Sequence, residues 1–231
     1  MLRFDNVTLM QGSFALKADF EIETGDHVAV IGPSGAGKST LISAVAGFLA
    51  PTTGKILWQG QDLASLGPGA RPMSILFQDN NLFPHLTVAQ NVGLGLRPDL
   101  HLSKEESARV AEALEQVGLE GKAESKPAEL SGGQMARVAI ARMVLRARPL
   151  MLLDEPFSAL GPALKREMLQ LVSDVANDTG ATLLMITHDP EDARRIAQKT
   201  VLVAGGNALP PMDTQDALDD PPAELAAYLG V

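Results

Sequence analysis

Apolar and polar side chains alternate along residues 14–22, and this alternation predicts a strand with one buried face. The apolar positions are Phe14, Leu16, Ala18, Phe20 and Ile22, separated by residues that include Lys17, Asp19 and Glu21. A spacing of two places side chains on the same face of a strand. Phe14 is therefore predicted to be a core residue of this strand.

Short apolar runs and longer amphipathic segments follow one another along the rest of the chain. We predict two short strands before residue 27 and further strands at His27–Ile31, Lys55–Trp58, Met73–Phe77, Leu150–Leu153, Ala181–Ile186 and Thr200–Val203. We predict helices at Ser39–Leu49, from a capping box at Ser103 to about Val117, at Gln134–Ala147, at Ala163–Asn177 and from Pro190 onward. Residues 60–72 are expected to form a loop. This alternation predicts an α/β fold with a parallel sheet between helices.

The length of 231 residues fits one domain. We expect residues 1–78 and 149–212 to form a core that includes an N-terminal antiparallel β portion. Residues 79–148 change to helical character and are expected to form an inserted subdomain. Residues 213–231 are expected to form a short tail of one or two acidic helices that simply packs on the core.

A glycine-rich segment between the strand His27–Ile31 and the following helix matches the phosphate-binding pattern G-x-x-x-x-G-K-[ST]. Glycines let the backbone curl around phosphates, and the N–H groups and the helix N-terminus attract negative charge. Lys38 is expected to reach the β- and γ-phosphates of ATP, and the Ser39 hydroxyl to bind Mg²⁺. The predicted nucleotide site comprises Gly32, Pro33, Ser34, Gly35, Ala36, Gly37, Lys38, Ser39 and Thr40.

Two acidic residues, Asp154 and Glu155, end the apolar run Leu150–Leu153. Ligands of open α/β sheets bind at the carboxyl ends of the strands. Asp154 is expected to hold the shell of Mg²⁺, and Glu155 to orient or deprotonate the attacking water. Acids that end strands are common, so it is the phosphate-binding segment that gives this pair its functional interpretation.

The chain resembles the ATP-binding cassette (ABC) family over essentially its whole length. Leu130–Gln134 is similar to the family's LSGGQ signature, and Pro156–Leu160 to its D-loop. Gln78 stands where the family has its Q-loop, and Thr187-His188-Asp189 resembles its switch-histidine loop. The resemblance implies that Gln78 senses the γ-phosphate and the metal, and that His188 contacts the γ-phosphate. It also implies that Ser131, Gly132, Gly133 and Gln134 bind ATP.

The resemblance further implies partners. Two copies of the chain would form an ATP-dependent head-to-tail dimer, with each ATP between the phosphate-binding segment of one copy and the signature of the other. An integral membrane permease would hold the pair at the cytoplasmic face of the membrane. A solute-binding protein would act indirectly, through the permease.

Residues 76–96 resemble the matching segment of ATP-binding subunits from bacterial thiamine importers. In this family the segment lies at the groove that receives the permease, and in this chain it contains Asn80, Asn81 and Phe83. The chain length fits the same subunits. The alternative is that this groove is generic and that the chain serves another small-nutrient importer, for example one that carries an anion, a metal or a polyamine.

Two positions depart from the family pattern. Many relatives carry an aromatic residue on adenine near positions 10–12, whereas this chain has Met10 and Gln11 there, and either of these could cover the base. Gly161 stands where the D-loop normally has aspartate. Loss of that carboxylate removes an expected contact across the dimer and puts tight coupling of the two sites in question.

Composition narrows the possible partners and compartments. The net charge of −9 argues against a nucleic-acid surface, because phosphates repel an acidic protein. The absence of cysteine excludes disulfides and thiolate metal sites. The first residues lack the layout of a signal peptide, and no run approaches the roughly 20 apolar residues of a membrane span. We therefore expect a soluble chain that reaches a membrane through its partner.

Two other functions are compatible with the motifs. A mechanical ATPase of the DNA-repair or chromosome-organising kind would also carry LSGGQ, but those relatives insert long coiled coils where this chain has a small helical segment. Gly161 also raises the alternative that the chain is a degenerate domain that binds ATP without hydrolysing it. Because Lys38, Gln78, Asp154, Glu155 and His188 are all present, we predict a working ATPase.

Overall fold

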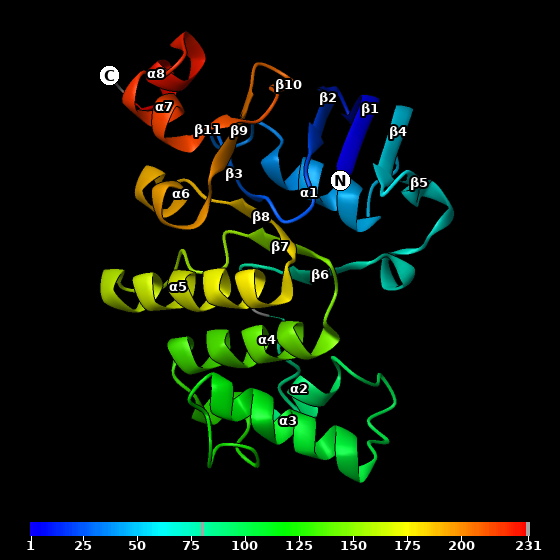
Figure 1. Cartoon of the computed structure of the whole chain (residues 1–231), viewed down its shortest axis with the longest axis vertical. Coiled ribbons are helices and arrows are strands. Elements are labelled where there is room, and N and C mark those ends of the chain that lie inside the picture. Colours follow the sequence, from blue (N-terminus) through cyan, green and yellow to red (C-terminus); the bar gives the residue numbers. More distant parts are fainter. Residues whose placement is uncertain (80, 230–231) are drawn as a thin grey trace.

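The computed structural model describes residues 1–79 and 81–229, and these form one mixed sheet of eleven strands with helices around it (Figure 1). The strands are β1 (Leu2–Gln11), β2 (Phe14–Ile22), β3 (His27–Ile31), β4 (Thr53–Trp58), β5 (Gln61–Asp62), β6 (Met73–Leu76), β7 (Leu150–Asp154), β8 (Thr182–Ile186), β9 (Lys199–Ala204), β10 (Asn207–Ala208) and β11 (Met212–Asp213). The helices are α1 (Lys38–Ala46), α2 (Val88–Gly93), α3 (Lys104–Gln116), α4 (Gly132–Arg146), α5 (Pro162–Thr179), α6 (Pro190–Ile196), α7 (Thr214–Asp219) and α8 (Ala223–Leu229). Single 3₁₀ turns lie at η1 (Leu63–Ser65), η2 (Pro68–Ala70) and η3 (Pro127–Glu129).

The sheet has an antiparallel and a parallel part. Its strand order is β5-β4-β1-β2-β10-β9-β3-β8-β7-β6, and β11 pairs with β9 outside this path. From β9 to β6 all neighbours are parallel, whereas β1 pairs antiparallel with both β2 and β4. The short strand β10 joins the two parts, parallel to β2 and antiparallel to β9. The predicted α/β fold with an antiparallel N-terminal portion is confirmed.

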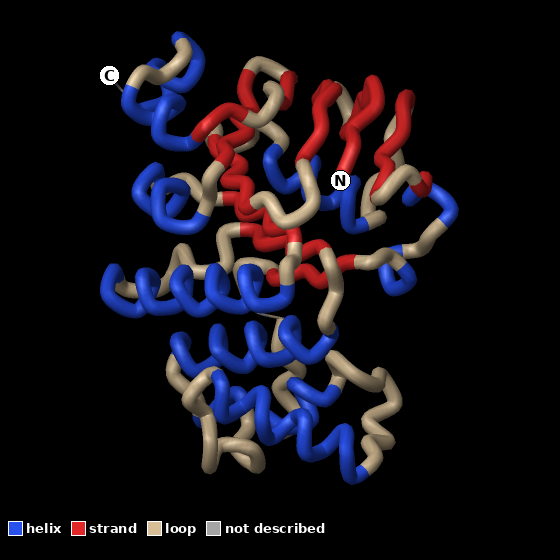
Figure 2. The backbone as a smooth tube through the Cα atoms, in the orientation of Figure 1, coloured by secondary structure: helices blue, strands red, loops and turns tan. Residues whose placement is uncertain are grey.

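The parallel strands are buried on both faces, which explains why they are continuous apolar runs in the sequence. Within β3, Val28 and Val30 face one hydrophobic cluster that contains α1 and the β1–β2 hairpin. Ala29 and Ile31 face a second cluster, which contains residues of α2 to α6. Helices therefore cover the two faces unequally, and Figure 2 shows α4 and α5 stacked beyond β6 and β7.

The described residues between β6 and β7 form a helical segment beside the core. Helices α2, α3 and α4 pack against one another there (Figure 1). The predicted capping box opens α3, where the Glu106 N–H donates to Ser103 Oγ and the Ser103 N–H donates to Glu106 Oε2. In the part of the chain that the structure describes, no helix has the length and hydropathy needed to cross a bilayer.

Several element boundaries differ from the prediction. Helix α1 ends at Ala46 rather than Leu49, because Gly47 adopts a left-handed conformation with φ 91° and terminates the helix. The predicted loop 60–72 contains the strand β5 and two 3₁₀ turns. Strands β1 and β2 are longer than the short strands expected, at 10 and 9 residues. Strands β1 and β2 pair with each other, and β1 also pairs with β4, and this pairing explains the length of both strands.

A buried arginine holds the end of α1. Arg71 is 5% exposed, and its guanidinium donates to the carbonyls of Ala44 (2.8 Å), Val45 (2.6 Å) and Leu66 (3.0 Å). Burial lowers the pKa of Arg71, and the charge of Asp62 opposes this effect. The last carbonyls of a helix lack partners within the helix, and Arg71 binds two of them, of which the Ala44 carbonyl also accepts from the Gly47 N–H.

A buried histidine at the start of β3 makes stability depend on pH. His27 is 2% exposed, and burial lowers its pKa from 6.5, against the opposing effects of a backbone hydrogen bond to Ile196 and the charge of Asp26. The unfolded chain therefore takes up a proton at higher pH than the folded chain. The free energy of unfolding should be highest above about pH 6.5 and fall as the pH drops toward the lowered folded value.

Denaturant titrations at several pH values check this expectation. The wild type should lose more stability between pH 7.5 and 5.5 than the variant His27→Gln, which has no titrating group at this position. His101 has a side chain that is 88% exposed, and His101→Gln is the matched control that should keep the wild-type slope. Equal slopes for wild type and His27→Gln would contradict the assignment.

Candidate functional site

The phosphate-binding segment needs glycine at two of its positions, because a side chain there would clash with neighbouring atoms. Gly32 follows β3 with φ 146°, and a Cβ there would lie 2.1 Å from the Val203 carbonyl oxygen of β9. Gly37 caps the N-terminus of α1 with φ 104°, and a Cβ there would lie 2.7 Å from Cζ of Phe14. The loop is therefore pressed against β9 and β2, which fixes its path into α1.

Lys38 and Ser39 occupy the first turn of α1. Lys38 is buried, and its Nζ donates to the carbonyls of Gly32 (2.8 Å) and Pro33 (2.9 Å). Burial lowers the pKa of Lys38, while the charges of Glu155 and Asp154 act in the opposite direction. The ammonium group thus lies inside the loop, close to the two carboxylates that end β7.

Asp154 faces this helix from the end of β7. Ser39 Oγ donates to Asp154 Oδ1 at 3.1 Å. Burial raises the pKa of Asp154 and the charge of Glu155 adds to this, whereas the Ser39 hydrogen bond and Lys38 lower it. A hydroxyl and a carboxylate are hard oxygen donors, which is the donor type that Mg²⁺ takes, commonly with phosphate oxygens and water in its remaining positions. Ser39 and Asp154 therefore fit a magnesium ion.

Glu155 and His188 form the second pair at the carboxyl end of the sheet. His188 follows β8, and its Nδ1 lies 3.2 Å from Glu155 Oε2. Glu155 has φ 46°, a left-handed conformation that a glutamate adopts at a cost of about 1 kcal/mol or more. Its N–H donates to the Ile186 carbonyl of β8 and its own carbonyl accepts from Ser158 Oγ, which together hold this conformation.

Lys38, Ser39 and Glu155 line one cavity of about 410 Å³. Its lining comprises Gln11, Phe14, Ser34, Gly35, Gly37, Lys38, Ser39, Thr40 and Glu155. Of the other predicted members of the segment, Pro33 contributes its carbonyl to Lys38, and half-buried Ala36 packs against the core beneath the loop. The predicted nucleotide segment therefore surrounds one concave site together with the predicted base.

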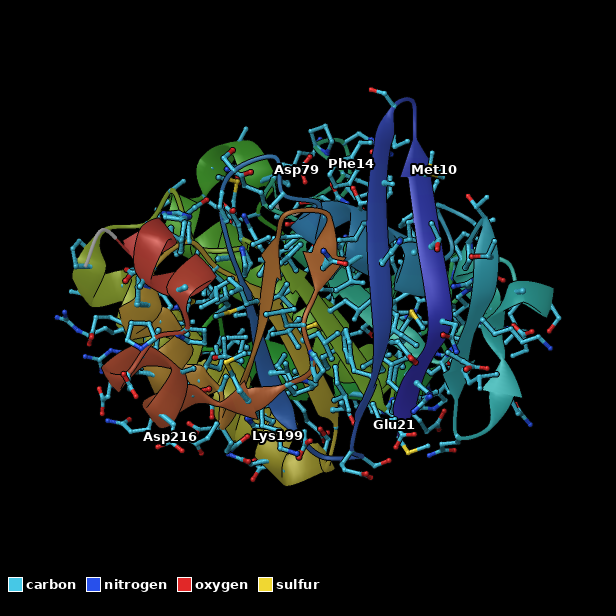
Figure 3. The ribbon with its side chains drawn as sticks, turned by 90° about the horizontal axis from the view of Figure 1, so that it is seen from above. Met10, Phe14, Glu21, Asp79, Lys199 and Asp216 are labelled. Atoms are coloured by element: carbon cyan, nitrogen blue, oxygen red, sulfur yellow. The ribbon has the colours of Figure 1, made fainter. Side chains whose placement is uncertain are left out.

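The β1–β2 hairpin contributes the rim of this cavity. Phe14 is half-buried and packs on the core, but it also lines the cavity, so its prediction as a core residue was incomplete. The hairpin turn follows Gln11, which pairs with Phe14 in the register, and Figure 3 shows Met10 and Phe14 at the same end of the hairpin. Met10 is 41% exposed, while Gln11 is the residue of the two that lines the cavity.

Gln78 lies apart from the phosphate-binding segment. It is exposed after β6, and it lines a separate open cavity of about 690 Å³ together with Asp154 and Ala159. Asp154 thus borders the cavity of Gln78 and is hydrogen-bonded to Ser39. Of the predicted metal residues, the structure joins Ser39 to Asp154 by a direct contact, while Gln78 shares only an open cavity with Asp154.

The signature residues are presented at the N-terminus of α4. Ser131 caps the helix, where its Oγ accepts from the Gln134 N–H and its own N–H donates to Gln134 Oε1. Ser131 and Gly132 are exposed, whereas a Cβ on buried Gly133 would lie 2.4 Å from Leu164 of α5. Among the described residues, none of the signature lines the cavity that contains Lys38.

A charged cluster beside His188 was not predicted. Lys165 of α5 lies 2.8 Å from Asp189 Oδ2 and 2.6 Å from Asp192 Oδ2, and Thr187 Oγ1 donates to Asp192 at 2.9 Å. Burial lowers the pKa of Lys165, but the hydrogen bonds that it donates to Asp189 and Asp192, together with their charges, outweigh burial and raise this pKa above its usual value. The hydrogen bond from Lys165 in turn lowers the pKa of Asp189. This cluster fixes the residues on either side of His188. No sequence signal identified Lys165.

The D-loop leads from Glu155 into α5. Gly161 is the N-cap of α5 in an extended conformation, with φ −65° and no side-chain cap. A Cβ at Gly161 would have nothing within 4 Å, so the missing carboxylate is not excluded by lack of space.

The segment 76–96 borders a groove between the core and the helical segment. A cavity of about 500 Å³ there is lined by Ser74, Ile75, Phe77, Asp79, Asn81, Leu82, Phe83, Leu94, Gly95, Ala139, Arg142, Met143 and Arg146. Phe83 is 46% exposed. Asn80, which was singled out in the sequence, lies outside the described residues.

Comparisons with known proteins give the family of this chain and its relatives. The sequence profile of the ABC transporter family matches residues 16–158. The thiamine import ATP-binding protein ThiQ of Cereibacter sphaeroides is 61% identical over 230 residues, covering 100% of both chains. The protein of the same name from Yersinia pseudotuberculosis is 50% identical and covers 100% of this chain and 98% of its own.

Two solved structures share the fold. The dimeric ATP-binding cassette MJ0796, in a post-hydrolysis state bound to ADP and Pi, has a TM-score of 0.79 at 30% identity and covers 93% of this chain and 99% of its own. The cbiO1 protein of Clostridium perfringens, part of the ABC transporter complex cbiONQ, has a TM-score of 0.84 at 27% identity and covers 99% and 94%. With the family profile matching more than half of its residues, and with relatives that align along its full length, this chain belongs to the ABC transporter family.

Proposed function

We propose that this chain is the ATP-hydrolysing subunit of an importer for thiamine or thiamine phosphates. The observation that carries the proposal is the identity of 61%, over the full length of both chains, to a thiamine import ATP-binding protein. The cavity that Lys38, Ser39 and Glu155 share, with Asp154 hydrogen-bonded to Ser39 beside it, supports the hydrolytic part. The reaction converts ATP and water to ADP and phosphate, and its free energy drives transport by a membrane partner.

The residues around the cavity have distinct roles in this reaction. Backbone N–H groups of the segment 32–40 and the Lys38 ammonium hold the β- and γ-phosphates. Ser39, Asp154 and Gln78 would hold Mg²⁺, which would neutralise charge that develops on the phosphate oxygens. Glu155 accepts the proton of the attacking water, and His188, next to Glu155 Oε2, donates to the γ-phosphate.

Adenine is expected to lie against the end of the β1–β2 hairpin. Phe14 and Gln11 line the cavity on that side, and an aromatic ring stacks well on a base. Phe14 would then supply the aromatic contact that many relatives have near positions 10–12, with Gln11 beside it in place of the expected cover by Met10 or Gln11 alone.

A second copy of the chain would complete each site. The signature residues Ser131 and Gly132 are exposed at a helix N-terminus, which is a suitable anion site, and they lie outside the cavity of their own chain. A head-to-tail dimer would place Ser131 to Gln134 of one copy over the γ-phosphate held by the other. Hydrolysis would remove this contact and open the pair.

The groove beside segment 76–96 is the proposed docking site for an integral membrane permease. It combines apolar contacts from Leu82, Phe83 and Met143 with the charge of Arg142 and Arg146. This mixture suits a short amphipathic segment of the permease. The chain would then work at the cytoplasmic face of the membrane, with a solute-binding protein acting through the permease and no role for nucleic acid.

Uptake of labelled nutrients tests the cargo. Cells that lack this chain should recover thiamine uptake with wild type and not with Glu155→Gln, while uptake of a labelled polyamine should be equal in all strains. Rescue of polyamine uptake instead would favour the other small-nutrient importers. Thiamine uptake that is the same with and without the chain, in cells that have no other thiamine carrier, would remove thiamine from the proposal.

A further inference from the structure

The C-terminal segment reaches the switch histidine of the catalytic site. After β11, Thr214 Oγ1 lies 2.9 Å from Thr200 Oγ1 of β9 in a buried contact, and Asp219 pairs with Arg194 of α6 at 2.6 Å. Leu225 of α8 is 0% exposed and belongs to the core. The segment is thus anchored along its length, and Figure 1 shows α7 and α8 on the side of the sheet where α6 lies.

Tyr228 ends this series of contacts. Its hydroxyl donates to the His188 carbonyl at 3.0 Å, and its ring packs against the core cluster. Burial raises the pKa of Tyr228, and the charges of Glu155 and Asp189 raise it further. The hydroxyl therefore keeps its proton and remains a donor at neutral pH.

The two neighbours of His188 are held by other groups. Asp189 is bound by Lys165, and Thr187 by Asp192. The peptide carbonyl of His188 itself is held by Tyr228, 40 residues further along the chain. A rotation of this peptide would move the imidazole away from Glu155 Oε2, which lies 3.2 Å from Nδ1.

We propose that Tyr228 is a positioning residue for ATP hydrolysis, which holds the His188 peptide so that the imidazole faces Glu155 and the γ-phosphate. The role rests on the proposed ATPase function. Tyr228 does not touch the reacting atoms, and among the described residues it does not line the cavity that contains Lys38. Its loss should therefore lower kcat and leave the KM for ATP unchanged.

The variant Tyr228→Phe tests this role, because it removes the hydroxyl and keeps the ring. One neutral hydrogen bond corresponds to a loss of about threefold to tenfold in kcat. The thermal midpoint should stay close to that of wild type, since the packing of α8 is retained. Leu225→Val is the matched comparison: it disturbs the buried side of α8 and keeps the hydroxyl, so it should lower the thermal midpoint with less effect on kcat.

Three results would overturn the proposal. An unchanged kcat in Tyr228→Phe, or a raised KM with unchanged kcat, would show that the hydroxyl does not position His188. A kcat that falls in proportion to the thermal midpoint in both variants would show a purely structural role. Wild-type phosphate release that does not exceed that of Glu155→Gln would overturn the ATPase assignment itself, and the positioning role with it.

Discussion

Replacing Glu155 with glutamine is expected to reduce ATP turnover by about 10²- to 10⁴-fold while nucleotide binding persists. Glutamine has nearly the same shape as glutamate, so it keeps the side-chain volume beside His188, but it cannot take a proton from water. The cavity lining contributed by Lys38, Ser39 and the glycines is unaffected. ATP should therefore bind and remain bound, and the head-to-tail dimer should accumulate.

Phosphate release, equilibrium ATP binding and light scattering measure the three parts of this expectation. Glu112→Gln is the matched control, because Glu112 is exposed on α3 and its substitution removes the same charge far from the cavity. This control should hydrolyse ATP like wild type and dimerise only transiently. Turnover in Glu155→Gln within a few-fold of wild type would show that another group is the base.

Replacing Arg71 with methionine is expected to lower the free energy of unfolding by about 3 kcal/mol. Methionine keeps the apolar stem but removes the donors to three carbonyls, two of which belong to the last turn of α1. The Ala44 carbonyl keeps the Gly47 N–H as a donor, so the Val45 and Leu66 carbonyls are the ones that lose their side-chain donor, and buried acceptors without partners cost about 1–3 kcal/mol each. Because α1 carries Lys38 and Ser39 at its other end, fraying should also weaken ATP binding.

Urea denaturation with Arg109→Met as control measures this effect. Arg109 is exposed on α3, so its substitution should change stability by no more than about 0.5 kcal/mol. A loss for Arg71→Met that is no larger than for the control would mean that water satisfies the carbonyls of Val45 and Leu66 equally well.

Local patterns were sufficient for most elements of the fold. The alternation in β2 and the apolar runs of β3, β7 and β8 identified strands, because burial on one or two faces imposes these patterns directly. The short strands β10 and β11 have no such pattern, since they are fixed by their pairing with β9. The end of α1 was placed too late because the run of apolar residues continues past Gly47.

Some residues of the candidate site could likewise be predicted from the sequence, and others could not. The phosphate-binding segment, Asp154 and Glu155 were predicted from motifs whose spacing follows from their chemistry, and His188 was predicted from the family resemblance. Phe14, Lys165 and Tyr228 act through contacts between distant parts of the chain, and such contacts depend on how α5, α8 and the hairpin pack. A periodicity of two correctly placed Phe14 on the inner face of β2, but it could not show that this end of the strand borders Gly37.

The order of strands in the sheet also constrains when the protein can fold. Strand β3 is made early, yet both of its neighbours come from the last quarter of the chain: Val28 pairs with Leu184 on one side and with Lys199 on the other. During synthesis the backbone of β3 has no neighbouring strand until β8 and β9 have been made. Formation of such long-range pairs is slow, and exposed strands of this kind are prone to aggregate. The central sheet, and with it the path of the phosphate-binding loop that is pressed against β9, must therefore assemble after residues 182–204 have been synthesised.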